Sequence, residues 1–210
     1  MTSGAFVTGT DTDIGKTLVS ACLAVAWRAA YWKPVQTGLA ADPGDTATVA
    51  ELAGLSPERV LRPAYAFQAP LSPHAAAAAE GTTIALERIQ CPQTTGPVVV
   101  EGAGGVLVPL NESALMADLI KRLGLPAIVV ARTSLGTINH TLLSLEALRA
   151  RDIRIAGVIL NGEENPGNRH AIETFGHVRV LAELPRLPRV DRPSIAALAA
   201  RMPDVATVSA

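Results

Sequence analysis

The residues whose spacing most clearly predicts chemistry lie near the start of the chain, in FVTGTDTDIGKTLVS, residues 6–20. The stretch ends in Gly15-Lys16-Thr17, as a phosphate-binding loop does, but Gly9 stands one residue too early for the usual G-x-x-x-x-G-K-[ST] spacing. In such a loop backbone N–H groups bind phosphate, the lysine neutralises its charge, and the threonine hydroxyl suits Mg²⁺. The pattern predicts a nucleotide site, and its alternative is a glycine-rich turn with a surface lysine.

Lysine is scarce in this chain, which has 15 arginines and only three lysines: Lys16, Lys33 and Lys121. Where arginine serves as the general surface cation, a retained lysine indicates that a compact ammonium is needed. We expect Lys16 to be solvated in its loop. Lys33 opens KPVQTG at the end of a predicted strand, where a parallel sheet places its ligands. It is predicted to face the same phosphate as Lys16, unless it is a solvated strand-end lysine.

Two acidic residues could complete a metal site with Thr17. Glu101 follows the apolar run PVVV and precedes GAGG, which is the arrangement of an acid that holds Mg²⁺ beside a nucleotide. The alternative for Glu101 is a surface carboxylate at the end of a strand. Asp45, in PGDTATV, opens a predicted helix and could be either a metal ligand or an N-cap. Spacing alone does not choose between these two roles for Asp45.

The elements that position these residues alternate between short apolar runs and amphipathic stretches, the pattern of β-α units around a parallel sheet. The predicted strands are residues 5–8, 30–34, 97–101, 126–131, 154–160 and 178–183. The predicted helices are residues 16–28, 45–54, 73–80, 83–90, 114–123, 137–150, 167–176 and 193–201. Ser72 before Pro73 is expected to cap its helix. Continuous Val/Ile/Leu strands predict helices on both faces of a mostly parallel central sheet. Together with the loop motif, this predicts an α/β, P-loop NTPase-like fold.

Amino-acid composition limits the expected number of domains, the classes of partner and the cellular location. A chain of 210 residues, 49% of them hydrophobic, can bury a large core as a single domain, residues 1–210. A net charge of -1 argues against a nucleic acid or an anionic membrane as partner. Nothing resembles a signal peptide or a run of roughly 20 apolar residues, so we expect a cytoplasmic protein. Cys22, Cys91 and the four histidines lack metal-ligand spacing, and both cysteines are expected to be reduced.

One connection is irregular. Between the helix ending near Arg28 and the strand at Tyr31 there is no glycine, proline or polar turn, although such a connection usually takes roughly 2 to 6 residues of turn chemistry. Our hypothesis is that the sequence lacks a mobile loop between Trp27 and Tyr31. A short ordered reverse turn in this span would contradict it.

Six motifs occur in the order expected of dethiobiotin synthetases: GTDTDIGKT, KPVQTG, SPHAAA, VEGAGGVLVPL, TSLGTINHTLLS and GVILNG. The chain resembles this family from about residue 4 to 188, and a P-loop with one extra residue is the family's own form. The resemblance implies that the protein joins CO₂ to 7,8-diaminopelargonic acid through a carbamate, which ATP phosphorylates before the second amine closes the ring. It further implies Mg²⁺, a homodimer, and no biotin prosthetic group.

The resemblance also implies roles for individual residues. The nucleotide would be held by Asp13, Ile14, Gly15, Lys16, Thr17, Leu18, Asp45, Glu101, Gly102, Ala103, Gly104, Asn161, Gly162, Pro185, Arg186 and Leu187. Thr12, Lys16 and Lys33 would be catalytic, and Thr17, Asp45 and Glu101 would surround Mg²⁺. Substrate would contact Thr37 and, across the dimer, Leu135, Gly136 and Asn139. Asp13 stands where glutamate is also common. His140 is expected to be a packed or capping residue.

Two other classes remain as alternatives. A deviant P-loop ATPase of the partitioning kind would be a nucleotide-switched binding protein, but it carries an extra lysine early in the loop, where this chain has Asp11. For the stretch TSLGTINH, residues 133–140, the alternative to a substrate-binding role is an ordinary helix start. A cobyric-acid-type synthetase would need a glutaminase domain with a nucleophilic cysteine, and hence far more chain.

Overall fold

A seven-stranded sheet in the order β4-β2-β6-β1-β7-β8-β9 forms the centre of the structure, a computed structural model that describes residues 3–209. Its strands are β1 (Gly4–Gly9), β2 (Ala30–Trp32), β4 (Val60–Leu61), β6 (Val98–Gly105), β7 (Ala127–Arg132), β8 (Ile155–Asn161) and β9 (Val180–Leu184). Every pair of neighbouring strands in it is parallel. A second, small sheet pairs β3 (Val35–Gln36) with β5 (Tyr65–Ala66). The predicted mostly parallel α/β architecture is confirmed.

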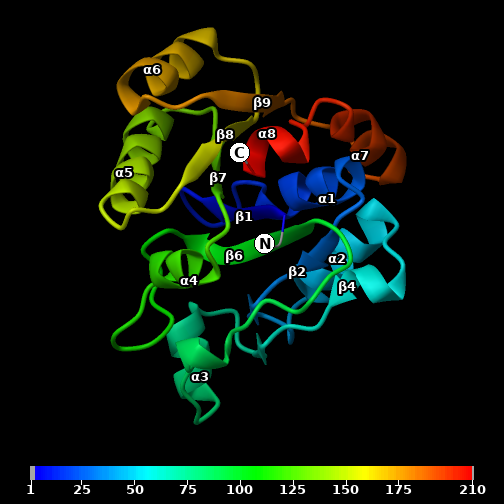
Figure 1. The fold of residues 1–210 in the computed structure, drawn as a ribbon, viewed down its shortest axis with the longest axis vertical. Helices are drawn as coiled ribbons and strands as arrows, with labels where there is room; N and C mark the ends of the chain where they lie inside the picture. The colour runs from blue at the N-terminus through cyan, green and yellow to red at the C-terminus, as the bar shows by residue number, and fades with distance from the viewer. Residues whose placement is uncertain (1–2, 210) are drawn as a thin grey trace.

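Helices cover both faces of the large sheet, as predicted (Figure 1). One face packs against α1 (Lys16–Ala26), α2 (Gly44–Ala53), α7 (Arg192–Ala199) and α8 (Val205–Ser209). The other packs against α3 (Pro73–Ala79), α4 (Met116–Leu123), α5 (Thr137–Arg149) and α6 (Pro166–Gly176). Two single 3₁₀ turns, η1 (Pro57–Arg59) and η2 (Leu86–Arg88), complete the described elements.

In the sequence the strands are continuous apolar runs, because their side chains pack into hydrophobic clusters on both faces of the sheet. Successive side chains point to opposite faces, so Val99 packs with α1 while Val98 and Val100 pack on the α4 side. All three of these valines are fully buried. The strand order also places the carboxyl ends of β2, β6 and β1 side by side. Ligands bind at this edge in open parallel sheets.

The prediction of a helix over residues 83–90 is wrong. Only the η2 turn forms there, and Ile84 is fully buried in extended chain. Tertiary contacts satisfy the backbone: the Ala85 N–H donates to the Tyr65 hydroxyl at 2.9 Å, and the Asn111 amide donates to the Ile84 carbonyl at 2.7 Å. These partners are distant in sequence, which is why local periodicity misled. The patterns also do not predict β3, β4, β5 or α8, none of which exceeds 5 residues.

Ser72 is the N-cap residue of α3, as predicted, but it does not cap the helix through its side chain. Its side chain makes no capping hydrogen bond, and its hydroxyl instead lies 3.1 Å from Nδ1 of His74. Pro73 does stand at the start of α3, as predicted. The predicted serine and proline therefore both stand at this helix start, without a side-chain capping bond.

The hypothesis of a missing loop is contradicted, because residues 27–31 form a short, ordered reverse turn. Arg28 takes a left-handed conformation with φ of 51°, and the Ala29 N–H donates to the Ala24 carbonyl at 3.0 Å. The Arg59 guanidinium donates to the carbonyls of Ala24 and Ala29 at 3.0 and 2.8 Å. A non-glycine residue therefore closes α1, and a distant arginine donates further hydrogen bonds to carbonyls of the turn.

Candidate active site

The phosphate-binding loop joins β1 to α1, as predicted. Gly15 takes φ of 97° immediately before α1, and α1 begins without a side-chain cap, so its first N–H groups are free to bind an anion. A Cβ atom on Gly15 would stand 2.1 Å from Nδ2 of Asn161, which itself donates to the Ile14 carbonyl at 2.9 Å. Glycine is therefore required here both by backbone conformation and by the close approach of Asn161.

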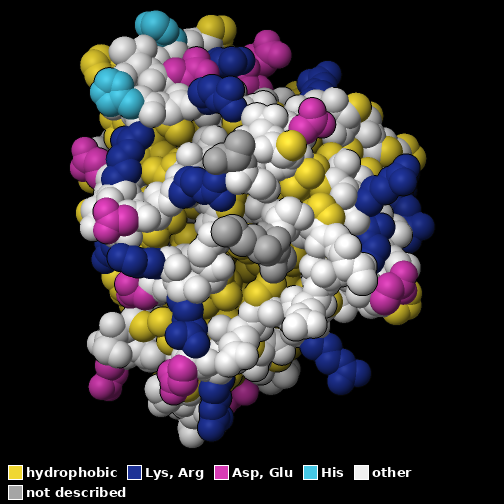
Figure 2. Space-filling view, viewed as in Figure 1, with side chains coloured by type: hydrophobic (Ala, Val, Ile, Leu, Met, Phe, Trp, Pro, Cys, Tyr) yellow, Lys and Arg dark blue, Asp and Glu magenta, His cyan; other side chains and the backbone are white. Residues whose placement is uncertain are grey.

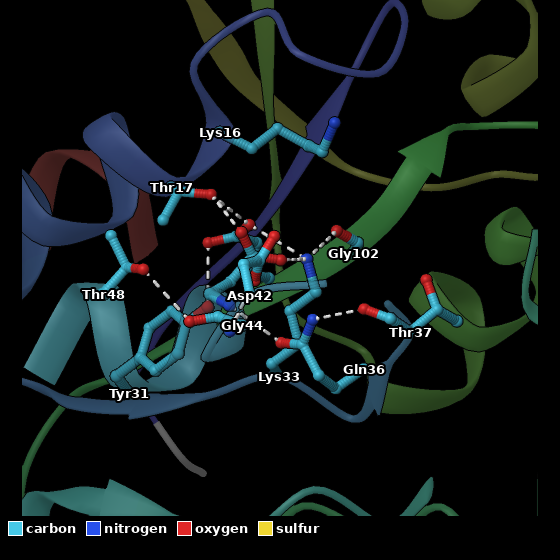
Figure 3. Close-up of polar contacts among 12 residues, drawn as sticks. Lys16, Thr17, Tyr31, Lys33, Gln36, Thr37, Asp42, Gly44, Thr48 and Gly102 are labelled. Carbon is cyan, nitrogen blue, oxygen red and sulfur yellow. Dashed lines mark hydrogen bonds and ion pairs between the residues drawn. The ribbon is translucent and has the colours of Figure 1, made fainter. Parts of the chain in front are cut away.

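Four predicted residues from separate elements meet below this loop, and Figure 3 labels two of them, Thr17 and Lys33. Lys33 follows β2, and its Nζ lies 2.5 Å from Asp45 Oδ2 and 3.1 Å from Glu101 Oε1. The Thr17 hydroxyl, in the first turn of α1, lies 2.7 Å from Asp45 Oδ1 and 3.1 Å from Glu101 Oε1. Lys33 also donates to the carbonyl of Gly102 at 3.2 Å. The solvated strand-end alternative for Lys33 is excluded.

The cluster is ionic and buried. Lys33 is 4% exposed and Glu101 only 1%, which also excludes the surface alternative for Glu101. Burial disfavours a charged ammonium, but the charges of Glu101 and Asp45 outweigh it, so the pKa of Lys33 is raised. Burial likewise acts to raise the pKa of Asp45, but Lys33 and the Thr17 hydroxyl lower it on balance. The Asp45 carboxylate is therefore held ionised beside the Lys33 ammonium.

Lys16 is buried rather than solvated as expected, with 7% of its surface exposed. Its ammonium donates to the backbone carbonyl of Asp11 at 2.8 Å and points away from the cluster around Lys33 (Figure 3). Burial lowers the pKa of Lys16, and the charge of Lys33 lowers it further. Two buried ammonium groups thus belong to one site, which favours an anion between them.

Asp45 does not cap α2. The helix starts at Gly44, whose N–H donates to the Asp42 carboxylate at 2.6 Å. The Asp45 carboxylate faces Thr17 instead, while its own N–H donates to Gln36 Oε1 at 3.0 Å. The capping interpretation of Asp45 is therefore wrong, and the acid belongs to the site.

These groups line one cavity of about 380 Å³ beneath the loop. Its walls are Thr12, Asp13, Gly15, Lys16, Thr17, Lys33, Gln36, Thr37, Asp45, Glu101, Ala103 and Gly104. All of them except Gln36 were predicted from the sequence. Gln36 orients Asp45 and donates to the carbonyl of Thr37 at 2.9 Å. Its position inside the motif KPVQTG is the signal that could have identified it.

The oxygen atoms of this cavity fit Mg²⁺. One hydroxyl and two carboxylates converge, and Mg²⁺ is usually bound by one or two carboxylates together with substrate phosphates. Within residues 3–209 there is no group of three or more His, Cys, Asp or Glu side chains that could hold a metal without such help. The donor set therefore suits a cation that arrives with a nucleotide.

Other predicted residues lie outside the cavity walls. The side chains of Ile14 and Leu18 pack in the core beneath α1. Asn161 and Gly162 end β8 beside the loop, and residues 185–187 follow β9 as half-buried or exposed chain. Leu135, Gly136 and Asn139 are exposed at the start of α5 and do not line the cavity of their own chain.

His140 is exposed, so the expectation of a packed histidine is wrong. It lines a second cleft of about 390 Å³ beside the loop, together with Asp11, Leu107, Leu143 and other residues. The two leucines are 51% and 56% exposed, which gives the cleft a mostly apolar rim. An apolar surface of this kind next to the cavity is suited to being covered.

Comparison with known proteins shows the family. A family model described as an AAA domain matches residues 3–194. The chain is 57% identical over 195 residues to the ATP-dependent dethiobiotin synthetase BioD of Paramagnetospirillum magneticum, covering 93% of this chain and 94% of that one. The chain belongs to the ATP-dependent dethiobiotin synthetase family. The synthetase of Brucella ovis is 51% identical over 187 residues, covering 89% of this chain and 88% of that one.

A further relative is a fusion. The chain is 59% identical over 192 residues to the biotin biosynthesis bifunctional protein BioCD of Bordetella avium. That match covers 91% of this chain but 41% of the relative, so the chain spans less than half of that protein. The synthetase family thus also occurs as one part of a longer polypeptide.

Solved structures confirm the P-loop ATPase fold. A ParA family ATPase from Chlorobium tepidum has a TM-score of 0.58 at 12% identity, covering 95% of this chain and 98% of that one. The MinC:MinD complex of Aquifex aeolicus gives 0.55 at 13% identity, covering 95% of each chain. In this chain the early loop residue Asp11 carries a negative charge and lies 2.5 Å from the Arg132 guanidinium. At 12% and 13% identity, the likeness to these two structures concerns the fold alone.

On the face seen in Figure 2, no large area carries charges of one sign, because Lys and Arg side chains are interspersed with Asp and Glu. Across residues 3–209, the helices are all too short or too polar to cross a bilayer.

Proposed function

We propose that this protein is an ATP- and Mg²⁺-dependent ligase that joins CO₂ to 7,8-diaminopelargonic acid and forms dethiobiotin, with release of ADP and phosphate. Family membership supports the overall reaction. The observation that carries the site assignment is the buried Lys33 ammonium, held between Asp45 and Glu101 at the floor of the phosphate cavity. Taking an ammonium and its carboxylate partners out of water costs free energy even when they are paired, and perturbed buried charges cluster at functional sites, so this group supports a functional role.

The reaction needs charge neutralisation more than a protein nucleophile. One substrate amine attacks CO₂ and forms a carbamate. A carbamate oxygen then attacks the γ-phosphorus, and the bond from that phosphorus to ADP breaks. The second amine attacks the carbamate carbon, phosphate leaves, and the ring is closed. Two anions must approach each other in the phosphorylation step, and the ammonium groups of Lys16 and Lys33 supply the opposing charge.

The loop binds and orients the phosphates. Backbone N–H groups of residues 12–17 would hold them at the start of α1, with Asp13 at the cavity wall. Thr17, Asp45 and Glu101 would hold Mg²⁺, which supplies charge neutralisation to the phosphate oxygens when bound. The Lys33 ammonium, already beside both carboxylates, is then close enough to meet the carbamate and the transferred phosphoryl group.

The adenine base of ATP and the diamine substrate would be recognised by residues around the loop. The Asn161 amide uses one hydrogen for the Ile14 carbonyl, which leaves its oxygen and second hydrogen for adenine. Gly162 and the segment 185–187 would border the base. The hydroxyl of Thr37, at the cavity wall, would contact the substrate.

The substrate carboxylate would be held by a second copy of the chain in a homodimer. Leu135, Gly136 and Asn139 do not line the cavity of their own chain. Leu135 is 102% exposed, and the neighbouring cleft carries the exposed Leu107 and Leu143. A second copy that covers this apolar surface would bring its own loop to the cavity, where the N–H groups at its α5 start and the Asn139 side-chain amide would bind a carboxylate.

A coupled assay of ADP release tests this function. We expect release only when ATP, Mg²⁺, the diamine and bicarbonate are all present, with dethiobiotin formed in equal amount. Omitting either the diamine or bicarbonate should reduce release to background. Steady ADP release without the diamine would instead support a nucleotide-switched ATPase and contradict the proposal.

A further inference from the structure

Tyr31 lies at the site although nothing in the sequence marked it. It belongs to β2 and is fully buried. Its hydroxyl donates a hydrogen bond of 2.9 Å to Oε2 of Glu101. A buried tyrosine needs a partner for its O–H group, and here that partner is one of the two carboxylates of the phosphate cavity.

The parallel register explains this contact. Tyr31 pairs with Val99, two residues before Glu101, and both members of that pair pack on the α1 side of the sheet. Residues two apart on a strand share a face, so Glu101 lies on the same side, one step further along. The ring of Tyr31 reaches along the strand to the carboxylate.

The two oxygens of Glu101 have different partners. Oε1 faces the cavity, with Lys33 Nζ at 3.1 Å and the Thr17 hydroxyl at 3.1 Å. Among residues 3–209, Tyr31 is the one hydrogen-bond donor to Oε2.

We propose that Tyr31 is a positioning residue that fixes the rotation of the Glu101 carboxylate and presents Oε1 to the metal that enters with the nucleotide. This inference rests on the proposed function, because it takes Glu101 to be a metal ligand. Ligating carboxylates are commonly held by an outer hydrogen bond, and losing that partner typically weakens metal binding by roughly 10- to 100-fold. A rigid, buried phenol is well suited to this because its ring has few alternative positions.

The competing explanation is that Tyr31 only fills the core and that its hydroxyl is merely satisfied. Replacement of Tyr31 by phenylalanine separates the two, because it removes the oxygen and keeps the packed ring. The chain offers a matched control, since Tyr65 is its other tyrosine. Tyr65 also has a hydrogen-bonded hydroxyl, at 2.9 Å from the Ala85 backbone nitrogen, but Ala85 does not line the phosphate cavity as Glu101 does.

The test measures Mn²⁺ binding to the full chain in the presence of ADP, by electron paramagnetic resonance. Tyr31→Phe should raise the Kd for Mn²⁺ by roughly 10- to 100-fold, while ADP affinity without metal stays unchanged. Tyr65→Phe should leave both values at those of the wild type. Thermal unfolding of the two variants shows whether each remains folded at the temperature of the measurement.

A double-mutant cycle with Glu101→Gln decides whether Tyr31 acts through Glu101. In that background Tyr31→Phe should change the Kd for Mn²⁺ less than twofold, because the group it orients has been replaced. An unchanged or lower Kd in Tyr31→Phe alone, or an equal loss in both backgrounds, would overturn the inference. If Glu101→Gln itself leaves the Kd unchanged, the metal assignment in the proposed function fails instead.

Discussion

Helices α1 and α5 begin alike but in different surroundings. Each follows a strand of the central sheet, and each has an N-cap glycine in the left-handed region, Gly15 with φ of 97° and Gly136 with φ of 92°. Neither start is capped by a side chain, so both present free N–H groups. The α1 start opens into a cavity with two buried lysines. The α5 start is exposed, with Leu135 entirely in solvent.

This difference indicates which part of the site one chain can build alone. At the α1 start the two lysine ammonium groups and the two carboxylates are in place, and Gln36 accepts a hydrogen bond from the backbone N–H of Asp45. The α5 start has the backbone geometry for an anion but no walls around it. We interpret the first as complete in one chain and the second as half of a site that a second copy completes.

The largest expected effect comes from Lys16. Because its ammonium is buried in the cavity, Lys16→Ala should reduce turnover by at least about 100- to 1000-fold, the loss typical when a preorganised charge-stabilising group is removed. The measurement is ADP release at saturating diamine and bicarbonate. Circular dichroism should show a folded protein.

Lys121 provides the control for that substitution. It is an exposed lysine on α4, with a long 3.8 Å ion pair to Asp152. Lys121→Ala removes the same charge and should retain full turnover, because exposed ion pairs contribute little. Near-normal turnover in folded Lys16→Ala would break the assignment of the α1 start as the phosphate site.

The next largest expected effect is on the Mg²⁺ concentration that turnover requires. Asp45→Asn should raise the Mg²⁺ concentration for half-maximal turnover by at least about tenfold, since the loss of an outer partner alone costs that much. Glu101→Gln should act in the same direction. Asp42→Asn is the matched control, because Asp42 bonds the first N–H of α2 and does not line the cavity. Equal Mg²⁺ titrations for Asp42→Asn and Asp45→Asn would exclude Asp45 from the metal site.

The central sheet and the α1 start could be predicted because their signals are local. Continuous apolar runs such as residues 97–101 identify strands buried on both faces, and the loop from Gly9 to Thr17 is one uninterrupted motif. Lys33 and Glu101 were also predictable, since polar residues at strand ends of a parallel sheet share an edge. Their distances required the fold.

The contacts that could not be predicted join residues far apart in sequence. Tyr31 and Glu101 are 70 residues apart, and nothing around Tyr31 distinguishes it from a core aromatic residue. Asp45 has equally good reasons to cap a helix or to face a cavity, and only the position of Thr17 decides between them. The turn at Arg28 likewise depends on Arg59, which no local rule connects to it.

The smallest expected effect, about fourfold below wild type, tests whether the α5 start belongs to the other copy. Lys33→Ala and Asn139→Ala should each be inactive alone. If each site combines the cavity of one chain with the loop of the other, a mixed dimer has one site with both lesions and one with neither. With about half of the dimers mixed and one of their two sites intact, activity should recover to about one quarter of wild type.

The control mixes Lys33→Ala with Lys16→Ala. Both lesions then lie in the cavity, so each site of a mixed dimer carries one of them and no activity should return. Recovery in the first mixture but not in the second identifies the loop at Asn139 as the contribution of the partner. If heterodimers form and neither mixture recovers, the α5 start serves its own chain, and the contrast between a complete and an incomplete helix start has to be abandoned.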